Sequence, residues 1–568
     1  MLDVLTTDVL VIGGGAAGTN AALKAADLGV EVVMVVKGLL GKSGCSVFAS
    51  HLPYYDATTE QKRADRYRYA VRYYNHYLTD QEHVRRMGQY MRTEFFEELE
   101  RLGFYVRRDD DGALLPSSNR VPVAAAYKQG ATGIVLMNSR RRAVLRLGLP
   151  VHEECAATSL LVDQGRVVGA TVLDYRRGRL FTVLAKSTVL ATGHADSLAT
   201  RSSATREQSA DGLAMAIRAG AEVANLESCW WHVSDMRAPR AWMRMHLYPN
   251  PLLGTDQSSR LYNNIGEMFY EQISHSPGSS APYVEQIRRL CLEVEAGRAN
   301  WDGNYVSGYD HIPSETILTF QHQAKVWKKL GLDVAKDRLE CGITWHMRQG
   351  GIDLDTETMQ TRLPGLYVAG GLGCHYLGGV GPVSYDGKVA GTNAAQTAHL
   401  ASAPVLPEAV VAAEEARLLG YLCADANGPR PIQVKTKIRA IMWELGYVKN
   451  EAKLEAARDA LRELRQRELS SMRLESTSRN WNTGWLDALD VASMLDACEA
   501  ICRSGLLRKE SRGAFYREDY PFIDNDNWLC KVILSRVGED NWRVRYEPYA
   551  TPHLKPDKGR EPFFEADY

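Results

Sequence analysis

The sequence has no excess of charge of either sign, because 68 lysines and arginines balance 69 aspartates and glutamates over 568 residues. A net charge of −1 offers no long-range attraction for nucleic acid or an anionic lipid surface, and we expect neither as a partner. No apolar run approaches the roughly 18 residues that cross a membrane, so we expect no membrane span. The first apolar strand begins close to the N-terminus, which leaves no room for a signal peptide and favours a cytoplasmic location.

The ten cysteines include no C-x-x-C pair, so their spacing supports neither an iron–sulfur cluster nor a zinc knuckle. Cys498 and Cys502 are one helical turn apart, which favours packing inside a helix over metal binding. We therefore expect no metal site and, in a reducing compartment, free thiols.

A glycine-rich motif lies near the N-terminus, between an apolar run at 9–12 and a helical pattern at 17–28. Gly13, Gly15 and Gly18 form a G-x-G-x-x-G motif, which allows a tight turn and a close approach of the backbone to a pyrophosphate. The pyrophosphate would lie at the helix N-terminus, where backbone N–H groups favour an anion. An ordinary tight turn is the alternative, and the strand-to-helix context favours the dinucleotide site.

A second apolar strand at 30–36 follows at the spacing expected of a Rossmann unit and ends at Lys37. A nicotinamide-binding unit has an acidic residue near this point to accept hydrogen bonds from the ribose hydroxyls. A lysine cannot accept those bonds, so the sequence disfavours a nicotinamide cofactor. The small polar residues at 41–46 suit a loop that approaches a ligand closely.

The stretch 59–102 is helical in pattern and rich in tyrosine, but no basic excess accompanies it. Half-buried tyrosines on amphipathic helices explain it better than base stacking. From residue 158 the pattern changes to strands at 159–163, 166–175 and 179–185, separated by turn residues, as in an antiparallel meander. A further buried strand is expected at 186–192, and it ends in A-T-G, an arrangement typical of flavin-binding proteins.

Motifs farther along the chain carry a family resemblance. The chain resembles the flavoprotein subunits of the fumarate reductase and succinate dehydrogenase family, which includes L-aspartate oxidase and the adenylylsulfate reductase alpha subunit. The matching segments are DGLAMAIRAGA at 211–221, Glu227 with Trp230-Trp231-His232, YNNIGEMF at 262–269, His346-Met347 with Gly350-Gly351-Ile352, PGLYVAGG at 364–371, and Glu510-Ser511-Arg512-Gly513 with Arg517, Asp519-Tyr520-Pro521 and Trp528.

The resemblance implies an α/β fold, with a Rossmann-like FAD-binding domain that contains the antiparallel meander, an inserted capping domain and a C-terminal helical domain. The heptad-like stretch 451–474 supports the helices of the last domain directly. The expected boundaries are 1–233 and 345–403 for the FAD-binding domain, 234–344 for the capping domain, 404–507 for the helical domain and 508–568 for a C-terminal segment.

The resemblance also implies FAD as cofactor, and noncovalent attachment. Members with covalent FAD use a histidine in R-S-H-T, whereas this chain has Gly44 in Lys42-Ser43-Gly44-Cys45. A linkage through Cys45 is the less favoured alternative. The implied FAD-binding residues are Gly13, Gly15, Ala16, Gly18, Lys37, Ser43, Gly44, Cys45, Ala191, Thr192, Gly193, Asp211, Gly370, Gly371 and Ser384.

His232 and His346 match the family's substrate-contacting histidines, and each follows a tryptophan. Two arginines of the family are missing. Tyr283 occupies the position of the proton-donating arginine, with Arg288 nearby, and the loop at 374–385 contains no carboxylate-binding arginine. We expect His232, His346, Tyr283 and Arg288 to be catalytic, with Arg289 as the alternative to Arg288 and His375 as a less favoured third histidine. A dicarboxylate is best held by guanidinium groups, so fumarate and succinate are disfavoured relative to a bulkier, planar or activated unsaturated acid.

The sequence therefore predicts an FAD-dependent oxidoreductase that transfers a hydride between flavin N5 and a small, unsaturated carboxylate substrate. The resemblance implies that the electron partner is a separate iron–sulfur subunit, and it implies an oligomeric state. Two alternatives stay open. The short loop and the Ser-Gly segment resemble adenylylsulfate reductase, where a nucleophile adds to the flavin. The chain could also be a noncatalytic flavoprotein that serves electron transfer.

Overall fold

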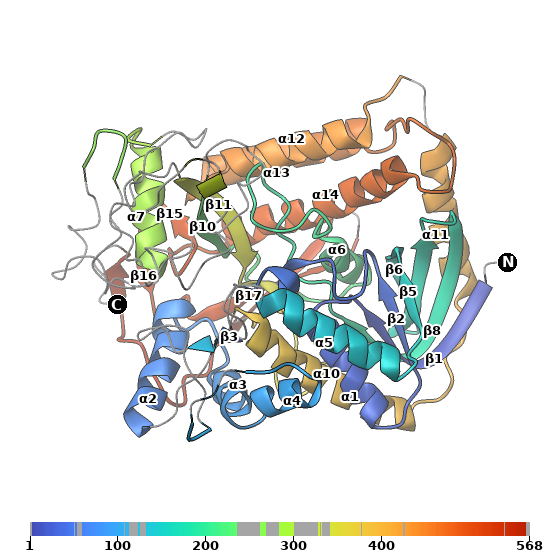
Figure 1. Cartoon of the computed structure of the whole chain (residues 1–568). Helices are drawn as coiled ribbons and strands as arrows, with labels where there is room; N and C mark the ends of the chain where they lie inside the picture. The colour runs from blue at the N-terminus through green and yellow to red at the C-terminus, as the bar shows by residue number, and fades with distance from the viewer. Residues whose placement is uncertain are drawn as a thin grey trace.

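A computed structural model describes residues 3–49, 52–53, 59–106, 108, 110–112, 123–124, 132–235, 262–267, 283–299, 328–329, 331, 341–375, 378–423, 427–538 and 540–563. Most of the predicted capping domain, 234–344, lies outside these residues, so the domain boundaries stay predictions. The fold is of the mixed α/β class, as predicted. The two ends of the drawn chain lie on opposite sides of the molecule in Figure 1.

The central sheet runs in the order β5-β2-β1-β8-β7-β6, and β13 pairs with β8. Strands β1, β2, β5 and β13 are parallel to their neighbours, whereas β6, β7 and β8 form the predicted antiparallel meander. The strands are β1 (Asp3–Ile12), β2 (Val32–Val36), β5 (Val151–Glu153), β6 (Cys155–Asp163), β7 (Arg166–Asp174), β8 (Arg179–Leu190) and β13 (Leu366–Val368).

The prediction of a separate buried strand at 186–192 is wrong, because β8 is one continuous strand of 12 residues. Its first half pairs with β7 and its second half with β13, while β1 pairs along almost its whole length. The meander and the parallel sheet are therefore joined by a shared strand. The buried pattern from Phe181 to Leu190 places this strand at the centre of the core.

Helices cover the central sheet (Figure 1). α1 (Ala16–Asp27) connects β1 to β2, and α10 (Val380–Leu400) packs beside α1. The remaining helices of this part are α2 (Glu60–Arg68), a π-helical turn (Tyr69–Tyr74), α3 (Gln81–Thr93), α4 (Phe95–Arg101), α5 (Thr132–Arg146), α6 (Asp211–Arg218) and α7 (Tyr283–Glu295). The first four of these lie in the stretch 59–102, which was predicted to be helical.

Four helices follow α10 and include the helix predicted from the heptad-like stretch. They are α11 (Glu408–Gly420), α12 (Pro431–Glu444), α13 (Glu451–Glu468) and α14 (Thr483–Leu507). α14 packs against α12 and α13 on one side and against α6 on another, so it connects this helical layer to the sheet domain (Figure 1).

Short strands complete the structure. β10 (Cys229–Asp235) pairs with β11 (Cys341–Arg348), and β9 (Val223–Ala224), β12 (Gly351–Ile352), β17 (Cys530–Arg536) and β18 (Trp542–Pro548) form a separate sheet. The others are β3 (Leu52–Pro53), β4 (Val123–Ala124), β14 (Val448–Lys449), β15 (Tyr516–Arg517), β16 (Phe522–Asp524) and β19 (Arg560–Pro562).

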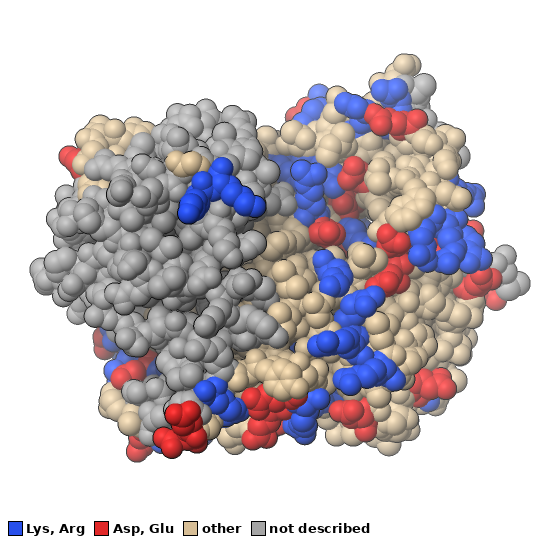
Figure 2. Space-filling view, in the orientation of Figure 1, with Lys and Arg blue, Asp and Glu red and all other residues tan. Residues whose placement is uncertain are grey.

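Two features are absent from the residues that the structure describes. None of their helices is long and apolar enough to cross a bilayer. No disulfide joins two cysteines among those that the structure describes. Figure 2 shows basic and acidic side chains close to one another on the described part of the visible face, consistent with the net charge of −1.

Candidate functional site

The turn between β1 and α1 has no room for side chains. Gly13 has a φ of 120°, and a Cβ there would overlap the carbonyl oxygen of Ala191 at the end of β8. A Cβ on Gly18 would overlap the carbonyl oxygen of Gly13. The first turn of α1 carries no acidic residue and no side-chain cap, although the Ala16 amide donates to Ser46 Oγ at 3.0 Å. This helix start has the tight backbone that a pyrophosphate requires.

Arg140 on α5 supports this turn, and the sequence analysis missed it. The side chain is 1% exposed, donates from Nη1 to the carbonyl of Ala16 at 2.5 Å and from Nη2 to Ser384 Oγ at 2.8 Å. Asn20 Nδ2 in turn donates to the Ser384 carbonyl at 2.6 Å. Arg140 therefore holds the start of α1 against the start of α10. In the sequence it stands in a run of three arginines, where nothing distinguishes it from its neighbours.

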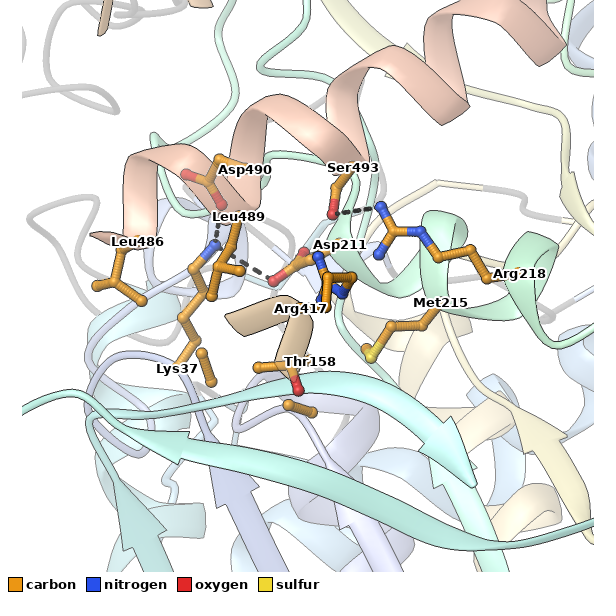
Figure 3. Close-up of a pocket in the computed structure, with 12 residues that line it drawn as sticks. Lys37, Thr158, Asp211, Met215, Arg218, Arg417, Leu486, Leu489, Asp490 and Ser493 are labelled. Carbon is orange, nitrogen blue, oxygen red and sulfur yellow. Dashed lines mark hydrogen bonds and ion pairs between the residues drawn. The ribbon is translucent and has the colours of Figure 1, made fainter. Parts of the chain in front are cut away.

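A narrow pocket, partly open to solvent, lies beyond the end of β2 (Figure 3). Lys37 points toward Asp211 on α6 and Asp490 on α14, with Nζ 3.2 Å and 2.7 Å from their carboxylate oxygens. The pocket is lined by Lys37, Ala156, Ala157, Thr158, Asp211, Met215, Arg218, Arg417, Leu486, Leu489, Asp490 and Ser493. The position at the end of β2 is where a Rossmann unit holds the ribose of its dinucleotide.

Neighbouring charged groups determine the protonation states of Lys37 and Asp490 in this pocket. Burial disfavours the charged form of Lys37, but Asp211 and Asp490 outweigh it and raise the pKa of Lys37. Burial alone would raise the pKa of Asp490, but Lys37 and Lys435 lower it to about 2. Lys37 is therefore a charged donor at neutral pH and cannot accept a bond from a ribose hydroxyl. Asp211, at the start of α6, is a hydrogen-bond acceptor beside Lys37.

The segment 43–45 lies beside residues that follow β8. Ser43 Oγ donates to the Leu39 carbonyl at 3.1 Å, and Cys45 Sγ donates to Gln208 Oε1 at 2.8 Å. Gly44 has a φ of 75°, and a Cβ there would meet no atom within 4 Å. Because Gly44 has no side chain, it cannot form the covalent bond of the R-S-H-T pattern.

Two further segments, 191–193 and 370–371, lie beside residues that the sequence analysis did not select. A Cβ on Gly193 would meet the side chain of Gln208, and a Cβ on Gly371 would overlap the ring of His194. The His194 ring fills the space that the absent side chain of Gly371 leaves. Burial, followed by the charge of Arg348, lowers the pKa of His194 to about 3, so its imidazole is neutral.

His346 lies at an irregularity of the two-stranded sheet. Trp230 pairs with Met347 and Trp231 with Trp345, so His346 is the extra residue of a β-bulge on β11. Its Nδ1 is 2.6 Å from Ser203 Oγ, which fixes the ring, and the residue is partly exposed. Bulges often reorient a side chain next to a functional site.

The other predicted catalytic residues have different environments. The backbone of His232 pairs with Thr344 beside the bulge, and Tyr283 begins α7, but the side chain of Tyr283 lies outside the described residues. Arg288 is fully buried and donates from Nη1 to the Phe563 carbonyl at 2.8 Å. Its guanidinium carbon is 3.3 Å from the centre of the Phe563 ring. The structure thus directs Arg288 toward the C-terminal segment.

The residues present fit a dinucleotide with a second, reactive ring system. The crowded turn of Gly13 and Gly18 suits the pyrophosphate, Lys37 and Asp211 lie at the end of β2 where a Rossmann unit holds a ribose, and His346 lies at a separate, partly exposed position. A parallel sheet that contains an antiparallel meander completes the architecture. Fold and site together define a dinucleotide-dependent oxidoreductase of the flavoprotein class.

Comparison with known proteins identifies the family. The FAD binding domain family matches residues 8–384, and the fumarate reductase flavoprotein C-terminal family matches residues 435–561. The chain belongs to the fumarate reductase and succinate dehydrogenase flavoproteins and is an FAD-dependent oxidoreductase, which confirms the predicted family and cofactor.

Individual relatives extend over nearly the full chain. The CoM/CoB fumarate reductase of Methanothermobacter marburgensis has a subunit that is 27% identical, over 94% of this chain and 97% of that protein. The structure of Mycobacterium smegmatis Sdh1 in complex with UQ1 has a TM-score of 0.84 at 25% identity, covering 97% of this chain and 96% of the other. Adenosine-5-phosphosulfate reductase with a covalent sulfite adduct shares the fold, with a TM-score of 0.77 at 19% identity. The match covers 97% of this chain and 96% of that one.

Proposed function

We propose that this flavoprotein transfers a hydride between FAD and a small unsaturated carboxylate, and that the FAD is held noncovalently. The observation that carries the proposal is His346, which sits at a β-bulge with its Nδ1 fixed by Ser203. A ring fixed in this way presents its other nitrogen in a defined direction, as a substrate-orienting histidine must. FAD, when bound, supplies the hydride chemistry at its N5 atom.

The residues around His346 support a role in binding and orientation. Trp231 and Trp345 are buried, with ring centres 5.8 Å apart, on the two strands that carry His232 and His346. The backbones of both histidines lie in one two-stranded sheet, and we propose that they act on the same substrate carboxylate. The rigid indoles favour a planar substrate.

The proton donor is proposed to be Tyr283, the residue in the place of the missing arginine. Its ordinary pKa near 10 suits an acid that must stay protonated at neutral pH. Arg288 is the second candidate, and it would have to release its bond to the Phe563 carbonyl to reach a substrate. A substrate larger than fumarate agrees with the absence of an arginine from the sequence of the loop at 374–385.

Electrons are proposed to come from a separate iron–sulfur subunit, because the sequence offers no cluster-binding C-x-x-C pair. The relative from Methanothermobacter marburgensis is itself described as one subunit of its reductase, which supports a partner. Noncovalent attachment is tested by acid denaturation, which should release the whole of the FAD into solution.

The experiment that tests the function is anaerobic oxidation of reduced viologen by the FAD-loaded protein, with fumarate and then a series of larger unsaturated acids. One of these acids should give turnover, and His346→Gln should reduce it by about 100-fold, a usual effect of removing a positioned catalytic group. His399→Gln is the matched control. That residue is exposed and its ring is hydrogen-bonded to the Leu28 carbonyl, away from the bulge, so turnover should be unchanged.

Absence of turnover with every acid, in a protein whose FAD is reducible, would contradict the proposal. Sulfite would then test the second candidate, nucleophile addition to the flavin, which Gly44 and the short loop at 374–385 favour. Bleaching of the flavin absorption by sulfite would support that candidate. A flavin that reacts with neither an acid nor sulfite would favour a role in electron transfer alone.

A further inference from the structure

Three buried side chains from distant parts of the chain converge below the FAD-binding segment that contains Gly370 and Gly371. His83 lies on α3, His375 follows Gly371 by four residues, and Asp386 lies on α10. They are 1%, 4% and 1% exposed. One ligand atom from each lies within 4.8 Å of the other two. α3 and α10 are in contact with each other in the fold (Figure 1).

The three side chains lie close together, but they do not satisfy one another's hydrogen-bonding atoms. His83 Nε2 is 3.4 Å from Asp386 Oδ1, and His375 Nε2 is 3.2 Å from Asp386 Oδ2. Even so, Nδ1 of His83, both ring nitrogens of His375 and Oδ1 of Asp386 make no hydrogen bond within the described part of the chain. Leaving a buried polar atom without a hydrogen-bond partner is unfavourable, so several such atoms in one place indicate a bound group.

The spacing suits a metal ion better than direct pairing. Two ligands of a tetrahedral zinc ion, each 2.0–2.1 Å from the metal, lie about 3.3 Å from each other. The two nitrogen–oxygen separations, 3.4 Å and 3.2 Å, are close to this value. The imidazole rings of His83 and His375 are nearly perpendicular, with centres 4.7 Å apart, so the rings do not stack on each other and block the space between them.

We propose that His83, His375 and Asp386 bind one divalent zinc-class ion, with its fourth position open to water. Two histidines and one carboxylate form a familiar ligand set for zinc and other first-row ions. The ion would tie α3 to α10 and to the segment after Gly371. Because Ser384 lies one half-turn before Asp386, the ion would also fix the part of α10 that faces the FAD turn. Its role is positional, and no electron passes through it.

The test begins with the intact, tag-free, FAD-loaded protein. Elemental analysis should find one zinc ion per chain, and removal by a strong chelator followed by addition of Co²⁺ should give the visible absorption bands of a tetrahedral cobalt site. His83→Gln and Asp386→Asn should abolish those bands. His399→Gln should retain them, because that exposed histidine is remote from the cluster and contacts the Leu28 carbonyl. The FAD content and the circular dichroism of each variant report whether it is folded.

Folded wild-type protein that contains no zinc and gives no cobalt bands would overturn the proposal, since the cluster would then hold only water. Cobalt bands that persist in folded Asp386→Asn and His83→Gln would also overturn it, because the ion would lie elsewhere. The cobalt spectrum of the wild-type protein is decisive even if both variants fail to fold. This result is independent of the proposed substrate chemistry, because no turnover is measured.

Discussion

At the scale of single residues, the glycine turn is the feature on which the proposed FAD site depends most. Gly13 and Gly29 both have positive φ, at 120° and 77°, but only Gly13 has no space for a Cβ. We predict that Gly13→Ala lowers the stability by at least about 2 kcal/mol and leaves the purified protein with little FAD. Gly29→Ala, where a Cβ meets no atom within 4 Å, should cost about 1 kcal/mol and keep full FAD content. Flavin absorbance and urea unfolding measure both effects, and equal FAD loss in the two variants would contradict the steric argument.

A second residue prediction concerns acid stability. Asp490 is 9% exposed in its side chain, and its pKa falls from 3.8 to about 2 because Lys37 and Lys435 outweigh the cost of burial. A depressed carboxyl pKa stabilises the fold above pH 4, and that stability is lost as the pH falls from about 4 to about 2. This pKa shift of Asp490 corresponds to about 2 kcal/mol of folding stability.

Asp490→Asn should therefore be less stable than the natural protein at neutral pH, and the difference should shrink as the pH approaches 2. Melting temperature as a function of pH measures it. Asp540→Asn is the control, since Asp540 is 62% exposed beside Arg462 and should leave the profile unchanged. A constant difference between pH 7 and pH 2 would show that the Lys37 ion pair is not the cause.

At the scale of elements, α1 and α10 pack closely through small residues. A Cβ on Gly387 would overlap the carbonyl of Ala17, and a Cβ on Gly391 would overlap that of Ala21. Gly387 and Gly391 are four residues apart on α10, and Ala17 and Ala21 are four residues apart on α1, so one face of each helix makes the contact. The N-terminus of α1 belongs to the FAD turn, which makes the distance between the helices important for the cofactor.

Gly391→Ala should force the two helices apart, destabilise the protein by about 1–3 kcal/mol and weaken FAD binding. Gly420→Ala makes the same chemical change at the end of α11, where a Cβ would meet nothing within 4 Å. That variant should be neutral or more stable by about 0.5–1 kcal/mol, since alanine favours a helix. Thermal unfolding and FAD titration compare the two, and destabilisation of equal size would refute the packing argument.

The sequence could predict the elements whose signals are local. The glycines at 13, 15 and 18 and the turn residues of the meander mark their own structures, because neighbours in the chain form them. The continuity of β8 could not be predicted, since its two halves pair with different strands. Tertiary packing alone brings Lys37 next to Asp490 and His83 next to Asp386. The spacing of these residues along the chain does not predict such contacts. His194 could not be selected from the sequence either. Its ring fills the space beside Gly371, and only the folded chain brings these two residues together.

At the scale of the whole molecule, the C-terminal segment is anchored to α7, at a residue 275 positions earlier in the chain, and to the strand β15. Phe563 is fully buried, stacks on Tyr516 with ring centres 5.1 Å apart and lies against Arg288 of α7. Phe563→Ala should cost about 3–5 kcal/mol and expose this segment to proteases. Limited proteolysis with mass spectrometry measures the release. Tyr546→Ala, at a side chain that is 50% exposed, should leave the cleavage pattern unchanged, and early cleavage in both variants would argue against a specific anchor.

The continuous strand β8 has a consequence for the way the molecule opens. Its amides and carbonyls complete hydrogen bonds with β1, β7 and β13, so an opening of β8 itself breaks the ladders of the meander and of the parallel sheet together. Regions that share a strand exchange their amide hydrogens as one cooperative unit. The meander should therefore take up deuterium as slowly as the nucleotide-binding strands, although the same hairpins on their own would exchange at once.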